Sequence, residues 1–183
     1  MKIETCQNSV RSQRTLVALA IGAALLLEAC IPQVIARGPE TNSPRLDGER
    51  FFTDDGVEMR VRRWLPNGRP ESIIIAAHGM NEHGKAFEWP AAFWRGKGIV
   101  TYALDQRGFG RSPDRGIWPG AENLTRDLAQ FTRQVRARHP DLPIFLLGES
   151  MGGGVVLPTA SRRDLVDVQG VILVAPAVAP WEE

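Results

Sequence analysis

The sequence has little of what marks a disulfide-stabilised, metal-binding or nucleic-acid-binding protein. Only two of its 183 residues are cysteines, Cys6 and Cys30, and both precede the part of the chain with globular character. A disulfide framework or a cysteine-based metal site is therefore disfavoured there. The charged residues are scattered, the formal net charge is +1, and no basic block occurs. Nucleic-acid binding accordingly finds little support.

The hydrophobic run near the N-terminus is too short for a comfortable membrane span. It covers Thr15 to Leu27 and follows Arg11 and Arg14, an arrangement typical of a signal peptide. The residues LEAC come next, ending at Cys30, and resemble a bacterial lipoprotein signal in which the cysteine becomes the lipidated first residue. We expect residues 1–30 to be a signal peptide of lipoprotein type, with the protein exported to the bacterial cell envelope and anchored to the membrane. A plain signal peptide or an uncleaved anchor remains open.

Residues 31–46 lack a sustained hydrophobic period and contain several prolines and polar residues. Such composition predicts a tether that holds a domain away from a membrane. We expect the globular domain to span residues 47–183.

The first part of this domain has the pattern of a β-hairpin. The segment from Glu49 to Pro66 contains a DDG turn at residues 54–56 between two strand-like runs. We expect Met59, Val61 and Trp64 on the inner side of the hairpin.

The remaining domain alternates between strand-like and helix-like patterns. Four short β-branched runs have the composition of strands buried on both faces. The clearest helix pattern covers Ala121–His139, where apolar residues recur every three or four positions. Strands separated by helices imply right-handed crossovers and a mostly parallel sheet, so the predicted fold class is α/β. The strand runs are SIIIAAHG, GIVTYALD, PIFLLGES and VQGVILVAP, and the other helix patterns span residues 85–97 and 151–163, the second interrupted or bent near Pro158.

A G-x-S-x-G motif follows the third of these strand runs. It consists of Gly148, Glu149, Ser150, Met151 and Gly152. On a turn between a strand and a helix this motif exposes a serine hydroxyl above the sheet, and small residues at both glycine positions avoid clashes. The context predicts a nucleophile elbow with Ser150 as the nucleophile.

Two further loops follow predicted strands. HGMNEHG, from His78 to Gly84, follows the first strand run and is placed to bring a backbone N–H beside the elbow. An oxyanion hole needs two such donors, so we expect the N–H groups of Met80 and Met151 to form it. In DQRGFGRS, which begins at Asp105, that residue and Arg107 are expected to hold the loop through hydrogen bonds to backbone.

The motifs HGMNEHG, DQRGFGRS and LLGESMGG, in this order, resemble the monoacylglycerol lipase and lysophospholipase group of α/β-hydrolases, which is also grouped with serine aminopeptidase-like hydrolases. The resemblance implies an α/β-hydrolase fold, of which this chain is the N-terminal portion without the lid and the last strands. It also implies Ser150 as nucleophile, Met80 and Met151 as oxyanion donors, and no metal or cofactor.

The chain contains no histidine after Ser150. Serine needs a histidine base and an acid that orients it, and in this fold both follow the serine along the chain. His78 and His83 belong to the predicted oxyanion loop, and His139 is expected at the opposite edge of the sheet. Asp164 and Asp167 fall in a connection expected at that opposite edge. We interpret the chain as a partial or truncated hydrolase without its triad acid and histidine.

The sequence therefore leads to three functional hypotheses. The first is a serine carboxylic-ester hydrolase acting on acylglycerols or lysophospholipids, inactive in the 183-residue form. The second is an aminopeptidase or amidase on the same fold, and the third is a non-catalytic, truncated envelope lipoprotein.

Overall fold

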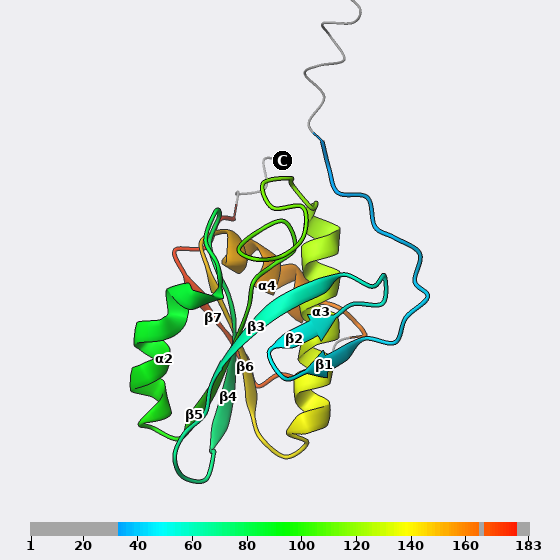
Figure 1. The fold of residues 1–183 in the computed structure, drawn as a ribbon. Helices are drawn as coiled ribbons and strands as arrows, with labels where there is room; N and C mark the ends of the chain where they lie inside the picture. The colour runs from blue at the N-terminus through cyan, green and yellow to red at the C-terminus, as the bar shows by residue number, and fades with distance from the viewer. Residues whose placement is uncertain (1–32, 165–166, 179–183) are drawn as a thin grey trace, which may run out of the picture. The chain divides into compact units, whose positions relative to one another are not determined.

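Seven strands form one sheet in the computed structural model, which describes residues 33–164 and 167–178 (Figure 1). Their order is β1-β2-β3-β5-β4-β6-β7. Strands β5, β4, β6 and β7 pair in parallel, and the first three strands pair antiparallel. The predicted α/β class with a mostly parallel sheet is confirmed. The strands are β1 Arg45–Asp47, β2 Arg50–Phe52, β3 Glu58–Trp64, β4 Ser72–Ala77, β5 Ile99–Leu104, β6 Ile144–Glu149 and β7 Gly170–Val174.

Helices cover both faces of this sheet. Figure 1 shows α2 on one side and α3 with α4 on the other. Helix α3 covers Ala121–Arg138, close to its predicted range. The predicted helix over residues 85–97 is a 3₁₀ turn, η1 Gly84–Phe87, followed by α2 Glu88–Arg95. Helix α4, Met151–Ala160, contains Pro158 and ends two residues after it, before the predicted limit of residue 163.

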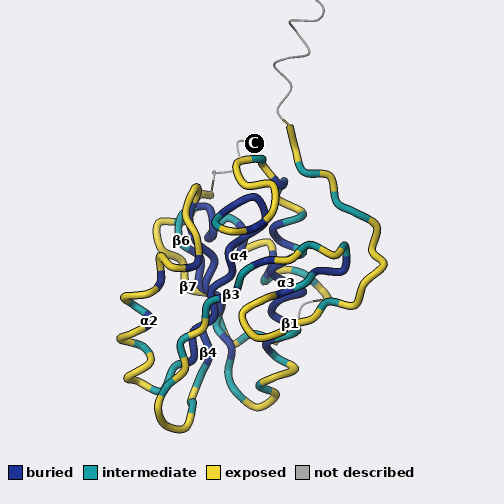
Figure 2. The backbone as a smooth tube through the Cα atoms, viewed as in Figure 1, coloured by how far each residue is buried: buried dark blue, intermediate teal, exposed yellow. Residues whose placement is uncertain are grey.

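The central strands are hydrophobic on both faces because each face meets a helix layer. Ile73 and Ile75 of β4 are fully buried in the larger core, which α3 and α4 cover. Ile74 and Ala76 point to the other side and pack in a smaller core with Phe87. Figure 2 shows the central strands buried and the outer side of α2 largely exposed.

The predicted hairpin is formed by β2 and β3, which pair antiparallel. Met59 and Val61 are fully buried in the larger core, as expected. The prediction for Trp64 is wrong, because this residue packs against the smaller core on the other face. In a strand the side chains alternate between faces, so residues 61 and 64 cannot share one.

Part of the segment predicted as a tether contacts the domain. The Ile35 backbone N–H donates to the Trp118 carbonyl oxygen at 2.9 Å. Arg37 donates to the Asp127 carboxylate at 3.1 Å, and Glu40 forms an ion pair with Arg126. The last two residues of the segment, Arg45 and Leu46, belong to strand β1.

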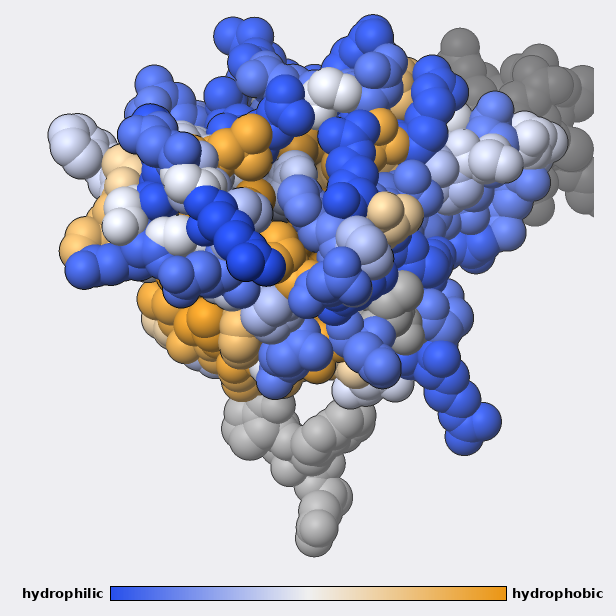
Figure 3. All heavy atoms as spheres, turned by 90° about the horizontal axis from the view of Figure 1, so that it is seen from below, coloured by the Kyte–Doolittle hydropathy of each residue, from blue (hydrophilic) through white to orange (hydrophobic). Residues whose placement is uncertain are grey.

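Strand β7 forms one edge of the described sheet and keeps apolar side chains accessible on both faces. Val171, Ile172, Leu173 and Val174 are 36%, 38%, 38% and 47% exposed. Seen from below, apolar atoms form patches on a surface that is otherwise mostly hydrophilic (Figure 3).

Within residues 33–164 and 167–178, no helix has the length and hydrophobicity that a membrane crossing requires. The predicted signal peptide and Cys30 lie outside the described residues.

Candidate active site

Ser150 occupies a sharp turn between strand β6 and helix α4. Its backbone has φ 50° and ψ −117°, a left-handed conformation that is unfavourable for a residue with a side chain. Neighbouring backbone holds this conformation in place. The Ser150 N–H donates to the Val174 carbonyl oxygen at 2.9 Å, and the Ala177 N–H donates to the Ser150 carbonyl oxygen at 2.8 Å. The strand–turn–helix geometry expected around the motif is therefore present, with a strained backbone at the serine.

The two glycines of the motif allow this turn to pack closely against the sheet. A Cβ atom on Gly148 would lie 2.4 Å from the Gly152 carbonyl oxygen. A Cβ atom on Gly152 would lie 2.0 Å from the carbonyl oxygen of Ala77, at the end of β4. Both distances are far below van der Waals contact, so these positions require glycine.

The loop from His78 to Gly84 lies directly beside the serine. A Cβ atom on Gly79 would lie 3.4 Å from the Ser150 Cβ atom. Met80, the next residue, is 50% exposed. Met151 is the first residue of α4 and is buried, and the first N–H groups of a helix have no partner within the helix. The predicted oxyanion donors thus belong to two segments that meet at Ser150.

His78 is fully buried, and hydrogen bonds occupy both of its ring nitrogens. The Gln106 backbone N–H donates to Nε2 at 3.1 Å, and Nδ1 lies 2.8 Å from the Gly79 carbonyl oxygen. Burial lowers the pKa of His78, outweighing the opposite effect of the Gly79 carbonyl. His78 is a neutral structural side chain with no free nitrogen to act as a base.

The other two histidines also have structural contacts. His83 caps η1, where its Nδ1 accepts a hydrogen bond from the Lys85 N–H at 3.2 Å. His139 follows α3 and lies 2.9 Å, Nε2 to hydroxyl, from Tyr102. Burial, with a smaller effect from Arg138, lowers the pKa of His139. Because α3 runs into the start of β6, His139 lies at the opposite edge of the sheet from Ser150, as predicted.

The loop after β5 holds the oxyanion loop in place through Asp105. Its carboxylate accepts hydrogen bonds from the Gly84 N–H at 2.8 Å and the Arg111 N–H at 3.0 Å. The prediction for Arg107 is wrong in its partners. This buried guanidinium binds the carboxylates of Asp127 at 2.7 Å and Asp55 at 2.8 Å rather than backbone. An arginine fork matches carboxylate geometry, and both acids come from segments distant in sequence.

Glu149, immediately before Ser150, is a site residue that the sequence reasoning missed. One of its carboxylate oxygens would lie 2.5 Å from a Cβ atom on Gly79. Burial and the nearby Glu82 carboxylate raise the pKa of Glu149. Its position inside the G-x-S-x-G motif places Glu149 next to the nucleophile in sequence. Its contact with the oxyanion loop, however, depends on the pairing of β4 with β6.

The two aspartates after Ser150 lie away from the site. Asp164 is exposed and pairs with Arg133 at 3.1 Å and with Arg162 at 2.9 Å. The backbone carbonyl of Asp167 accepts a hydrogen bond from Arg136 of α3. As expected from the topology, neither carboxylate is near Ser150.

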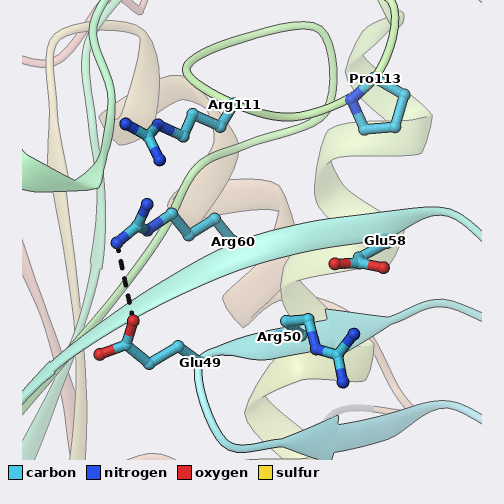
Figure 4. Close-up of a pocket in the computed structure, with 6 residues that line it drawn as sticks. All are labelled: Glu49, Arg50, Glu58, Arg60, Arg111 and Pro113. Atoms are coloured by element: carbon cyan, nitrogen blue, oxygen red, sulfur yellow. Dashed lines mark ion pairs between the residues drawn. The ribbon is translucent and has the colours of Figure 1, made fainter.

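A charged hollow of about 510 Å³ lies elsewhere, over the hairpin (Figure 4). Figure 4 shows the ion pair between Glu49 and Arg60, which are 3.6 Å apart. None of the residues that line it belongs to the elbow or to the loop at residues 78–84. They are Glu49, Arg50, Glu58, Arg60, Arg111 and Pro113.

The chain is similar to known proteins of one hydrolase family. A family profile described as serine aminopeptidase S33 matches residues 68–183. Monoglyceride lipase of Mus musculus is 32% identical over 149 residues, which cover 76% of this chain and 49% of that protein. Monoacylglycerol lipase of Mycolicibacterium smegmatis is 33% identical over 130 residues, covering 67% of this chain and 44% of that protein.

Solved structures show the same fold. A carboxyl esterase from Bacillus coagulans has a TM-score of 0.59 at 24% identity, over 71% of this chain and 42% of the esterase. A monoglyceride lipase variant from Saccharomyces cerevisiae has a TM-score of 0.57 at 22% identity, over 79% of this chain and 47% of the lipase. The chain thus spans about half the length of the relatives it matches.

Proposed function

Because the chain belongs to the serine aminopeptidase S33 family of α/β-hydrolases, we propose that it carries the nucleophile and oxyanion half of a serine carboxylic-ester hydrolase of monoacylglycerol lipase or lysophospholipase type. The observation that carries this proposal is the strained turn at Ser150, between β6 and α4, beside the loop at residues 78–84. Relatives named as monoglyceride lipases support an acylglycerol ester as the substrate class.

In the proposed reaction, the Ser150 hydroxyl oxygen attacks the ester carbonyl carbon while a base accepts the hydroxyl proton. The Met80 and Met151 N–H groups donate to the oxyanion that forms. The intermediate then expels the alcohol, which takes up the proton, and leaves an acyl ester on Ser150. Water hydrolyses this ester and releases the fatty acid.

The base is the part that this chain does not supply. His78 has contacts on both ring nitrogens, His139 lies at the opposite edge of the sheet, and His83 caps η1 through Nδ1. Efficient turnover therefore requires an acid and a histidine from beyond the described residues. We expect the 183-residue chain to react slowly with a fluorophosphonate probe. Labelling of Ser150 at a rate typical of serine hydrolases would contradict this part of the proposal.

The nucleophile assignment is tested in a form of the protein that contains an acid and a histidine after these residues. Ser150→Ala should abolish monoacylglycerol hydrolysis, because no other group can form the acyl ester. Ser161→Ala is the matched control, since Ser161 directly follows α4 and its hydroxyl donates to the Leu157 carbonyl oxygen at 3.1 Å. Retained turnover in Ser150→Ala would refute the assignment.

An aminopeptidase or amidase is the second candidate. The carboxylate of Glu149, next to Ser150, and that of its neighbour Glu82 favour it, because a substrate amine is attracted to negative charge. Monoacylglycerols, short-chain esters and aminoacyl anilides assayed side by side distinguish the two. Faster turnover of the anilides would replace the ester proposal.

We also propose export and anchoring through Cys30, on the basis of the signal-like sequence before it. Cys30→Ser should release the protein from the membrane fraction, and Cys6→Ser should not. Unchanged membrane association of the Cys30 variant would contradict the lipoprotein proposal. A chain that is anchored but unreactive in every assay would favour the non-catalytic envelope lipoprotein.

A further inference from the structure

We propose that His78 is a positioning residue, which fixes the direction of the Met80 N–H by holding the carbonyl of Gly79. The inference rests on the proposed role of Met80 in the oxyanion hole. It concerns the orientation of a single peptide group, so it can be tested without any catalytic reaction.

The argument begins with the planarity of the peptide bond. The Gly79 carbonyl and the Met80 N–H belong to the same rigid peptide group and point in opposite directions. Whatever fixes the carbonyl oxygen therefore also fixes the N–H. This oxygen lies 2.8 Å from His78 Nδ1 and accepts the Glu82 N–H at 3.3 Å. With the carbonyl held by these two contacts, the Met80 N–H points in the opposite direction within the peptide plane.

The contact between His78 Nδ1 and the Gly79 carbonyl oxygen is a hydrogen bond only if the ring carries its proton on Nδ1. Gln106 enforces this tautomer, because its backbone N–H donates to Nε2 at 3.1 Å and so requires an unprotonated nitrogen there. The Gln106 side-chain amide also donates to the His78 carbonyl oxygen at 2.9 Å. His78 is 0% and Gln106 4% exposed, so water does not compete for these bonds.

This chain of contacts links the loop after β5 to the oxyanion loop. Gln106 orients the His78 ring, the ring holds the Gly79 carbonyl, and the carbonyl sets the Met80 N–H. The Phe109 and His78 rings form a T-shaped pair, with centroids 5.9 Å apart and planes at 80°. The ring therefore has little freedom to turn, which is what a positioning residue requires.

The neutral ring must persist among several ionisable neighbours. Glu82 and His83 flank it on its own loop, Asp105 follows β5, and Glu149 ends β6 beside Gly79. Protonation of Nε2 would place a proton against the Gln106 N–H and break that bond. The arrangement is thus maintained only while His78 stays neutral.

Nitrogen NMR of the full 183-residue chain tests the inference directly. The ring nitrogens of His78 should show the Nδ1–H tautomer, unchanged as the pH falls from about 8 to about 6, across the ordinary histidine range. The Met80 amide should keep one chemical shift over the same range. An Nε2–H tautomer, or a His78 that titrates near the ordinary value, would overturn the proposal.

Two substitutions separate positioning from packing. His78→Asn keeps a nitrogen donor where Nδ1 lies, whereas His78→Leu removes it. We expect the Met80 amide nitrogen shift to stay close to the parent value in His78→Asn and to move away from it in His78→Leu, because only asparagine still donates to the Gly79 carbonyl. His139→Leu is the control for loss of a partly buried imidazole and should leave Met80 unchanged. Equal Met80 nitrogen shifts in His78→Asn and His78→Leu would overturn the proposal.

The tautomer measurement needs no variant, so the proposal stays testable if His78→Leu fails to fold. In a form with full activity, His78→Leu should lower kcat and leave KM nearly unchanged, and His78→Asn should recover most of kcat. Failure of the Ser150 assignment would appear in the activity assays and leave the NMR result intact. Failure of the positioning role would appear in the NMR and leave Ser150→Ala inactive.

Discussion

Single residues around Ser150 are constrained more by backbone contacts than by their own chemistry. Ser150 has a positive φ, and backbone hydrogen bonds with Val174 and Ala177 stabilise this conformation. Gly152 allows helix α4 to start directly against the end of β4. The geometry of the nucleophile thus depends on positions that carry no functional group.

Gly152→Ala should destabilise the domain and displace the elbow. The added methyl group would lie 2.0 Å from the Ala77 carbonyl oxygen, and rigid backbone on both sides cannot yield. Overpacking of this kind costs about 1–3 kcal/mol or more in unfolding free energy. Urea denaturation followed by circular dichroism measures the change.

Gly68→Ala provides the control for this substitution. A Cβ atom on Gly68 would have open space around it. The unfolding free energy of the variant should therefore stay within about 0.5 kcal/mol of the parent value. A stable Gly152→Ala protein would show that α4 can shift away from β4.

The sequence could predict the glycines and the serine because the motif is local, with all five residues adjacent in the chain. It could not predict the role of His78, which depends on the Gln106 backbone, 28 residues away. The placement of Glu149 against Gly79 likewise requires the register of β4 with β6. A contact made by a main-chain group cannot be predicted from the type of residue that supplies it.

At the scale of elements, Arg107 joins the hairpin, helix α3 and the loop after β5. Its guanidinium is 2% exposed and binds Asp55 in the hairpin turn and Asp127 in α3. Arg37, from the segment before β1, also forms an ion pair with Asp127 at 3.1 Å. The sequence predicted the hairpin from its DDG turn and α3 from its apolar periodicity, but the ion pairs between them depend on the fold.

Arg107→Met should destabilise the domain strongly. Removing the cation leaves the buried carboxylates of Asp55 and Asp127 without their main partner, which typically costs about 3–5 kcal/mol. Chemical denaturation of the variant measures this loss. Arg115→Met, an exposed position in the same loop, should have little effect. Similar losses in both variants would show that the buried ion pairs do not matter.

Within this cluster, Asp55 should make the domain sensitive to acid. Burial opposes the charge on Asp55, but hydrogen bonds from Arg107 and Thr53 outweigh it and hold the pKa of Asp55 well below its usual range. The stability from this lowered pKa is present above the unfolded-state value of about 3.9 and is lost as the pH falls further.

Denaturation midpoints measured from about pH 6 to about pH 3 test this linkage. In the parent the midpoint should fall below about pH 4, where unfolded carboxylates take up protons. Asp55→Asn should be less stable at neutral pH and show a shallower fall, because residue 55 no longer titrates. Asp47→Asn, an exposed site in β1, is the control. Parallel curves for the parent and Asp55→Asn would exclude this carboxylate as the source.

At the scale of the whole molecule, the sheet is covered unevenly. Helices α3 and α4 bury one face, and α2 contacts mainly β5 on the other. Ile172 of β7 pairs in register with Leu147, and Val174 pairs with Glu149. By strand alternation these two side chains share the face of the sheet on which α2 lies. The matched part of this chain covers about half the length of the monoglyceride lipase of Mus musculus.

We expect β7 to drive self-association of the 183-residue chain. An edge strand with free backbone groups and accessible apolar side chains is a template for pairing with another copy. The double variant Ile172→Lys and Val174→Lys should remain folded, because both side chains are more than one-third exposed. It should also sediment as a monomer at concentrations where the parent associates. Leu157→Lys, on α4 at a similar 37% exposure, is the control for added charge alone. If that control also suppressed association, general charge repulsion rather than the β7 edge would be responsible.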